Sequence, residues 1–221
     1  MTGVKICGLR DTSHVRIAAE AGADWVGFVL YEPSPRNILA SGPHALEPLV
    51  DLAEFAQGLG TACVALMVDP HPELVESVAA LGLLNAIQLH GSETPDQVGH
   101  LGRLAGGRCE MWKALRIKDE DDLEALGAWP VDRLLLDAAP SVSSTIPGGN
   151  GEPFDWGLLD GVEMPGPWLL AGGLTLDNVV AAIAATGAPA VDVSSGVERV
   201  RGVKDEDMIR AFIDAVKLAW G

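Results

Sequence analysis

Short apolar segments alternate with amphipathic helical segments along the chain, and this alternation limits the possible fold more than any other feature of the sequence. Eight apolar segments have the length and residue types of strands, at residues 4–9, 25–30, 62–68, 86–90, 110–117, 132–138, 167–172 and 190–195. Seven helical segments lie between or after them, at residues 14–22, 45–60, 72–82, 95–106, 119–129, 176–187 and 206–220. Only a short helix is expected between residues 150 and 166. Strict alternation of this kind predicts parallel strands joined by right-handed crossovers.

Eight strand–helix units in a compact chain predict an α/β fold, a single (β/α)8 TIM barrel formed by one domain over residues 1–221. The fold usually takes about 250 residues, so a chain of 221 residues would form a barrel smaller than usual. An open doubly wound sheet is the alternative, and it is disfavoured because no G-x-G-x-x-G motif follows the first strand. No linker or low-complexity segment divides the chain.

Composition and charge argue against several classes of partner. The start MTGVKICGLRDT lacks the features of a signal peptide and no apolar run reaches membrane-spanning length, so we expect a cytoplasmic protein that does not enter a membrane. A formal net charge of −16 disfavours binding to nucleic acid or to an anionic membrane. The three cysteines form no C-x-x-C pair, which argues against a disulfide framework and against a zinc site.

Polar, reactive and glycine residues gather where the predicted strands end. The active site of a TIM barrel lies at the carboxyl ends of its strands. The residues at these ends are Cys7, Gly8, His90, Gly91, Asp137, Gly172, Gly173, Ser194, Ser195 and Gly196. Cys7 has two interpretations, because a free cysteine is often a small core residue, whereas a cysteine at this rim would face a ligand. His90 is kept as a substrate-binding candidate, since a histidine at a strand end is more often structural than catalytic.

The glycines after the last two predicted strands indicate an anion site. Gly172-Gly173 and Ser195-Gly196 allow backbone N–H groups to approach an anion closely. Either pair alone is typical of a turn, but the loops after strands 7 and 8 often bind phosphate in this fold. We therefore expect these four residues, together with Ser194, to bind a phosphate group. Backbone donors would hold it despite the acidic net charge of the chain.

Two loops at the same rim have features of a binding site. In YEPSPRNI, Pro33 and Pro35 stiffen the chain and present Arg36, either as an exposed side chain or as a clamp for a carboxylate or phosphate. The segment AAPSVSSTIPGGNGEPFDW after Asp137 is long for a strand–helix connection. Because loops of this length are usually functional or disordered, we interpret residues 141–153 as an active-site lid.

Six separated motifs occur in order along the chain, namely VKICGLR, GADWVGFVLYEPSPRNI, NAIQLHGSE, LLLDAAP with GGNGEPFDW, LLAGGLTLDNV and AVDVSSGVERVRGVKDEDMIRAFIDAVK. Together they resemble the phosphoribosylanthranilate isomerase family of tryptophan biosynthesis. The resemblance implies a (β/α)8 barrel without cofactor or metal. It implies conversion of N-(5-phosphoribosyl)anthranilate into 1-(2-carboxyphenylamino)-1-deoxyribulose 5-phosphate by an Amadori rearrangement. It further implies that Cys7 is the general base and Asp137 the general acid, that Arg36 lies near the anthranilate carboxylate, and that the AGGL and SSGVE loops bind the phosphate.

Two features near the site have more than one interpretation at the level of sequence. Period-two alternation places Lys5 on the same face as Cys7, and strand 8 adjoins strand 1 in a closed barrel. Lys5 and Asp192 are therefore expected to form either a buried ion pair beneath the site or a plain structural polar contact. Asn150, Glu152 and Pro153 depart from the usual residues of the family's lid, which concerns the dynamics of the lid and not the chemistry.

Two other functions compete with this interpretation. The histidine-pathway isomerase performs the same rearrangement on a bisphosphorylated substrate, but it resembles two half-barrel repeats and uses two aspartates. Here strand 1 offers Cys7, and only one phosphate site is evident. A catalytically silent barrel that senses a sugar phosphate is the other rival, and the presence of both Cys7 and Asp137 speaks against it. We expect a small-molecule sugar-phosphate substrate, and the sequence leaves open whether the protein is a monomer or a homodimer.

Overall fold

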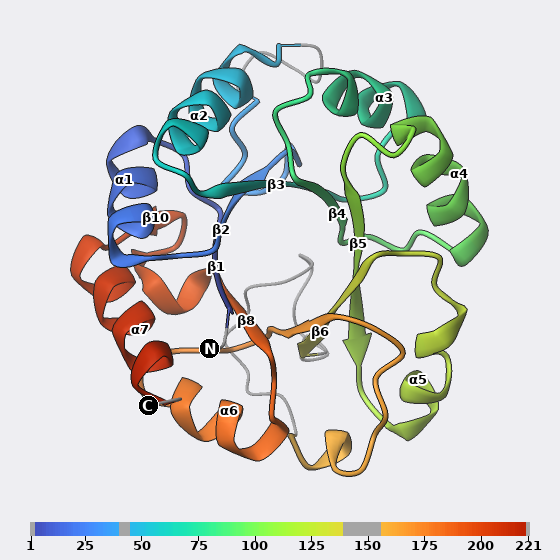
Figure 1. Ribbon diagram of the computed structural model, residues 1–221, viewed down its shortest axis with the longest axis vertical. Helices are drawn as coiled ribbons and strands as arrows, with labels where there is room; N and C mark the ends of the chain where they lie inside the picture. Colours follow the sequence, from blue (N-terminus) through green and yellow to red (C-terminus); the bar gives the residue numbers. More distant parts are fainter. Residues whose placement is uncertain (1–2, 40–44, 139–155, 220–221) are drawn as a thin grey trace.

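Eight parallel strands close into a barrel in the computed structural model. Figure 1 shows the strands as a ring inside the helices. The structure describes residues 3–39, 45–138 and 156–219. Neighbouring strands follow chain order, and the barrel closes between the first and the last. Their bounds are β1 Gly3–Cys7, β2 Trp25–Val29, β3 Ala62–Met67, β4 Ala86–Leu89, β5 Glu110–Ile117, β6 Arg133–Ala138, β7 Trp168–Leu170 and β8 Ala190–Val193. The predicted (β/α)8 barrel is therefore confirmed.

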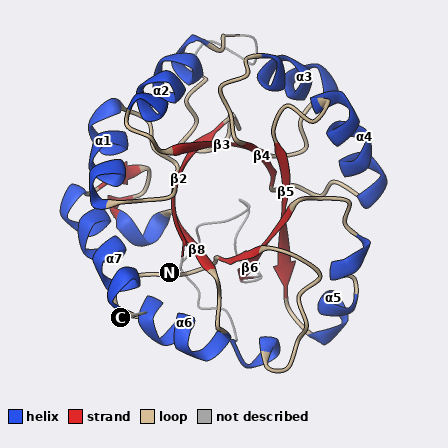
Figure 2. Cartoon of the chain, viewed as in Figure 1, coloured by secondary structure: helices blue, strands red, loops and turns tan. Residues whose placement is uncertain are grey.

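Helices surround the barrel on its outside (Figure 2). The α-helices are α1 Thr12–Ala21, α2 Glu47–Gly58, α3 Pro72–Ala80, α4 Pro95–Ala105, α5 Glu120–Glu124, α6 Val179–Thr186 and α7 Glu206–Leu218. Short 3-10 helices are η1 Leu126–Ala128, η2 Trp156–Leu159 and η3 Ser195–Val197. None of the helices in the described ranges has both the length and the apolar character needed to cross a membrane.

Two predicted helices differ from the observed ones. The helix expected over residues 119–129 ends at Glu124 and continues only as η1, where Gly127 has a low helix propensity. The helix expected from residue 176 begins at Val179 instead. The preceding residues form a turn, because the Asn178 side chain accepts a hydrogen bond from the Thr175 backbone N–H at 2.8 Å.

The helix expected over residues 14–22 is α1, and local capping interactions place its observed ends at Thr12 and Ala21. The Asp11 side chain accepts a hydrogen bond from the backbone N–H of His14 at 2.9 Å, which satisfies a free donor at the start of α1. Gly22 ends the helix with a φ of 92°, in the left-handed region that favours glycine. These local signals place α1 so that β1 ends at the barrel rim, just before the helix begins.

A two-stranded antiparallel sheet, which the sequence did not predict, follows β8. Its strands are β9 Glu198–Val200 and β10 Val203–Lys204, and Gly202 has a φ of 81° at the turn between them. Strands this short and this rich in charge have no apolar alternation to detect. The hairpin lies against the loop after β2, since a Cβ on Gly202 would be 3.0 Å from that of Pro35.

Large side chains fill the amino-terminal end of the barrel interior. Trp112 is fully buried, and its ring meets Trp25 edge to face with 5.7 Å between the ring centroids. The Arg133 guanidinium lies over both rings, 5.3 Å from Trp25 and 5.1 Å from Trp112. Leu135 and Leu169 belong to the same buried cluster. This layer closes one end of the barrel and leaves the carboxyl ends of the strands for a site.

Candidate active site

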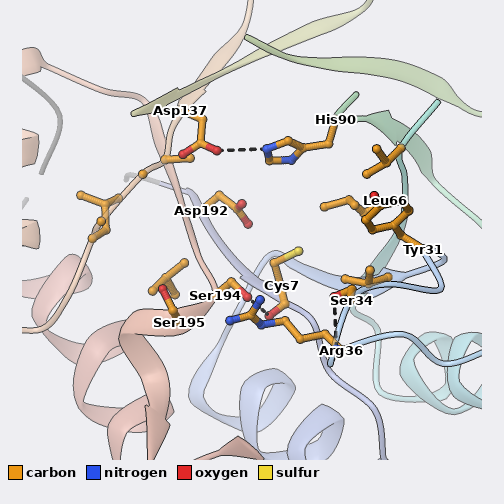
Figure 3. Close-up of a pocket in the computed structure, with 17 residues that line it drawn as sticks. Cys7, Tyr31, Ser34, Arg36, Leu66, His90, Asp137, Asp192, Ser194 and Ser195 are labelled. Atoms are coloured by element: carbon orange, nitrogen blue, oxygen red, sulfur yellow. Dashed lines mark hydrogen bonds and ion pairs between the residues drawn. The ribbon is translucent and has the colours of Figure 1, made fainter. Parts of the chain in front are cut away.

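A pocket lies at the carboxyl ends of the strands, where the active site was predicted (Figure 3). The volume of the pocket, including the part that is open to solvent, is about 740 Å³. Figure 3 shows Asp137 and His90 on one side and Cys7 and Arg36 on the other. The predicted site residues that line the pocket are Cys7, Arg36, His90, Asp137, Gly172, Gly173, Ser194 and Ser195.

Gly196, the remaining predicted site residue, does not line this pocket and has a packing position instead. A Cβ built on it would collide with the carbonyl group of Leu174. Gly196 lies in η3 after β8, and Leu174 lies in the loop after β7. The missing side chain therefore lets the two loops predicted to bind phosphate lie directly against each other.

Both interpretations of Cys7 hold in part. The residue is 3% exposed and packs with Val29 and Leu66, as a core residue would, yet it also lines the pocket. Gly27 on β2 makes room for it, because a Cβ there would lie 2.9 Å from Cys7 Sγ and 3.3 Å from Lys5 Cε. The last residue of β1 thus presents a desolvated thiol to the pocket.

A buried ion pair lies beside this thiol. Lys5 and Asp192 are register partners on β1 and β8, and Lys5 Nζ lies 2.8 Å from Asp192 Oδ1. Burial alone would lower the pKa of Lys5, but the Asp192 carboxylate and the Cys7 thiol outweigh it, so that pKa is raised. The expected ion pair is confirmed, and Lys5 stays charged next to Cys7.

Burial raises the pKa of the Cys7 thiol, because a thiolate in this position loses its water. The Lys5 ammonium opposes the shift, Asp192 adds to it, and Lys204 opposes it again. The two ammonium groups make the thiolate easier to form than it would be in an equally buried site without them.

Asp137 belongs to a hydrogen-bonded chain that runs to β4. His90 Nε2 lies 3.0 Å from Asp137 Oδ2, and Gln88 Nε2 lies 3.1 Å from His90 Nδ1. Because the amide nitrogen of Gln88 can only donate, His90 Nδ1 accepts, and Nε2 carries the proton that His90 donates to Asp137. Asp137 is buried, and this chain fixes the orientation of its carboxyl group.

Arg36 is buried, so the interpretation as an exposed side chain is wrong. Glu198 on β9 accepts hydrogen bonds from its Nε at 2.6 Å and from its Nη2 at 2.8 Å. The Arg36 backbone N–H donates to Ser34 Oγ at 3.1 Å. The aliphatic part of Arg36 crosses Gly8, where a Cβ would lie 2.6 Å from Arg36 Cδ. The prolines of this loop and the glycine that Arg36 crosses thus hold the arginine side chain at the pocket wall.

Sequence reasoning missed Glu198 and Lys204. Lys204 Nζ donates to Glu198 Oε1 at 3.0 Å, and to the carbonyl and hydroxyl oxygens of Ser194 at 2.7 Å and 3.2 Å. Burial alone would raise the pKa of Glu198, but hydrogen bonds from Arg36 and the charge of Lys204 lower it to about 2. The sequence did contain a signal for Glu198, because it is the glutamate of the SSGVE motif and could pair with Arg36.

The predicted lid, residues 141–153, lies outside the described residues, and so do Asn150, Glu152 and Pro153. In the ranges that the structure describes, no three His, Cys, Asp or Glu side chains gather as the ligands of a metal ion would. The described pocket offers a thiol, a carboxyl group, an imidazole and a guanidinium, next to two glycine-containing loops. Such a set suits proton transfer on a small anionic molecule.

Comparison with known proteins gives one consistent family. The family model described as N-(5'phosphoribosyl)anthranilate (PRA) isomerase matches residues 4–215. The N-(5'-phosphoribosyl)anthranilate isomerase of Hyphomonas neptunium is 52% identical over 218 residues, which are 98% of each chain. That of Rhodospirillum rubrum is 47% identical over 218 residues, again 98% of each chain.

Solved structures agree with the sequence relatives. Phosphoribosyl anthranilate isomerase from Thermotoga maritima is 35% identical with a TM-score of 0.79, and the match covers 98% of this chain and 99% of that one. A phosphoribosyl anthranilate isomerase in complex with reduced 1-(o-carboxyphenylamino)-1-deoxyribulose 5-phosphate is 33% identical with a TM-score of 0.77 and the same coverage. Because the family model and these relatives cover nearly all of it, the chain belongs to the N-(5'-phosphoribosyl)anthranilate isomerase family.

Proposed function

We propose that Cys7 is the general base and Asp137 the general acid of the Amadori rearrangement that this chain catalyses. The family isomerises N-(5'-phosphoribosyl)anthranilate to 1-(2-carboxyphenylamino)-1-deoxyribulose 5-phosphate in tryptophan biosynthesis, and this chain is an enzyme of that reaction. The observation that carries the two roles is the position of the thiol and the carboxyl group on opposite sides of one pocket. A sugar lying across the pocket would meet both groups.

Asp137 acts first in this scheme. It gives a proton to the ring oxygen of the ribose, which opens the furanose and leaves a Schiff base at C1. The hydrogen bond from His90 supports the role, because it occupies Oδ2 and leaves Oδ1 as the oxygen that can give a proton to the substrate. His90 orients the acid, and since it also lines the pocket it stays a candidate for substrate binding.

Cys7 acts second. Its thiolate removes the proton from C2 and produces an enolamine, which tautomerises to the ketone of the product. The thiolate is the basic form of cysteine. Lys5, kept charged by Asp192, and Lys204 both favour that form electrostatically, which supports the role of Cys7 as a base.

The two anionic ends of the substrate are assigned to two other parts of the pocket. Arg36 retains N–H groups that Glu198 does not use, and a guanidinium end of this kind suits the anthranilate carboxylate. Gly172 and Gly173 have φ values of 82° and 65°, a conformation that brings backbone close to a ligand. Together with Ser195 they support a phosphate site at the pocket wall.

Replacing Asp137 by Asn tests the proposed acid. The amide keeps the shape of the carboxyl group and can still accept from His90, but it has no acidic proton. Turnover, followed by the loss of anthranilate fluorescence, is expected to fall by about 10²–10⁴-fold. Calorimetric binding of the reduced product should be retained. Asp132→Asn, at an exposed position before β6, is the control that should keep wild-type turnover. Near wild-type turnover in Asp137→Asn would overturn the role of Asp137.

A further inference from the structure

A buried glutamate on the hairpin after β8 has no part in the proton transfers described above. The side chain of Glu198 is 3% exposed. Its Oε1 accepts from Arg36 Nε and Lys204 Nζ, and its Oε2 accepts from Arg36 Nη2 and the Gly202 backbone N–H at 2.9 Å. Four donors on two oxygens satisfy the carboxylate and hold it in one position.

The carboxylate takes one particular edge of the guanidinium. Glu198 bonds the edge formed by Nε and Nη2 of Arg36, in the bidentate geometry that gives such pairs their directionality. The end formed by Nη1 and the second N–H of Nη2 is left for another acceptor. Because Arg36 lines the pocket, the edge that Glu198 occupies decides which N–H groups a ligand can meet.

We propose that Glu198 is a positioning residue for substrate recognition, which fixes the Arg36 guanidinium so that its free end meets the carboxylate of the anthranilate ring. The inference rests on the proposed contact between Arg36 and that carboxylate. The hairpin holds Glu198 from two sides, since Gly202 lies against Pro35 and Lys204 ties Glu198 to Ser194. A guanidinium that is ordered before binding spares the ligand the entropic cost of ordering it.

Glu198→Asp separates position from charge. The variant keeps the negative charge beside Arg36 and Lys204, but its carboxylate lies one methylene further back. The probes are the reduced product and the same compound without the ring carboxylate, and the ratio of their Kd values is the carboxylate preference. In Glu198→Asp this preference is expected to fall by roughly 3- to 10-fold, because the Arg36 side chain must then be ordered when the ligand binds. Affinity for the compound without the carboxylate should not change.

Two further variants complete the experiment. Arg36→Met is expected to abolish the carboxylate preference, and in that background Glu198→Asp should cause no additional loss, because the two residues act through one contact. Glu93→Asp is the matched control, since Glu93 is also a buried rim glutamate, paired with Lys113 Nζ at 2.6 Å, and it does not line the pocket. This control should keep the native preference.

The outcomes distinguish the inference from the function on which it rests. A native preference in Glu198→Asp, combined with a lost preference in Arg36→Met, overturns the positioning role and leaves the role of Arg36 intact. A native preference in Arg36→Met overturns both. If Glu198→Asp does not fold, Glu198→Gln takes its place, because its amide nitrogen opposes the donors of Arg36 or Lys204. The preference should fall there too, and an unchanged value overturns the inference.

Discussion

At the scale of single residues, the position of Cys7 depends on the residue opposite it in the sheet. Gly27 is the register partner of Cys7 on β2. Glycine usually weakens a strand, and in a strand interior it often marks a close approach of neighbouring atoms. Here the space above Gly27 is shared by the thiol of Cys7 and the side chain of Lys5. The strand that carries Cys7 therefore needs a neighbour without a side chain at this position.

Gly27→Ala tests this requirement. The added methyl group would lie 2.9 Å from Cys7 Sγ and 3.1 Å from Cys7 Cα, so the thiol must shift. We expect a loss of about 1–3 kcal/mol in the free energy of unfolding from overpacking. We also expect a loss of roughly 10- to 100-fold in kcat/KM, since small displacements of a catalytic group cost this much.

Gly58→Ala is the matched control for this variant, because nothing lies within 4 Å of the methyl group it adds at the end of α2. It should leave kcat/KM unchanged and keep or raise the melting temperature. Full activity in Gly27→Ala would show that the thiol tolerates displacement, contrary to the proposed role of Gly27.

At the scale of elements, the hairpin of β9 and β10 completes the pocket wall through ion pairs. Glu198 joins Arg36 in the loop after β2 to Lys204 on β10, and Lys204 holds the end of β8 through Ser194. One carboxylate thus connects the hairpin and the neighbouring end of β8 to the loop after β2, in which Arg36 lies 162 residues before Glu198. The hairpin depends on that carboxylate being charged.

The charge of Glu198 predicts how stability depends on pH. Its pKa is lowered in the folded protein from 4.5 to about 2, so its stabilising effect is fully present above pH 4.5 and is lost as the pH falls toward 2. The effect amounts to at most about 3 kcal/mol. In urea unfolding, the stability difference between wild type and Glu198→Gln should therefore shrink between pH 4.5 and pH 2.

An exposed glutamate provides the comparison for this pH series. Glu76→Gln on α3 should differ little from wild type at any pH, since exposed charges contribute little to stability. A difference between wild type and Glu198→Gln that stays constant down to pH 2 would contradict the assigned charge of Glu198.

At the scale of the whole molecule, the charge near the pocket differs from that of the chain. The formal net charge is −16, yet the buried cations Lys5, Arg36 and Lys204 lie at the site. Two carboxylates, those of Asp192 and Glu198, pair with them. An acidic protein can therefore receive an anionic substrate, because buried cations next to the ligand outweigh distant surface charges that salt screens.

The barrel and most of its site could be predicted from sequence because both depend on regular repeats. Alternation of strand and helix determines the closed sheet, and the fold then brings the residues at the strand ends together. Cys7 and Asp137 were placed in this way at the rim where the pocket lies. Gln88, Glu198 and Lys204 could not be found, because their contacts depend on how loops and side chains pack in three dimensions. The end of α5 at Glu124 likewise depends on the low helix propensity of the residues that follow, which the spacing of apolar residues does not reveal.

The turnover number of Cys7→Ala tests the central claim most directly. The variant removes only the sulfur atom, so the barrel should still fold and bind the reduced product. If Cys7 is the base, kcat should fall by about 10²–10⁴-fold, whereas Cys63→Ala, which removes a buried thiol outside the pocket, should keep wild-type kcat. A folded Cys7→Ala enzyme with near wild-type kcat would contradict the account and make Cys7 an ordinary core residue.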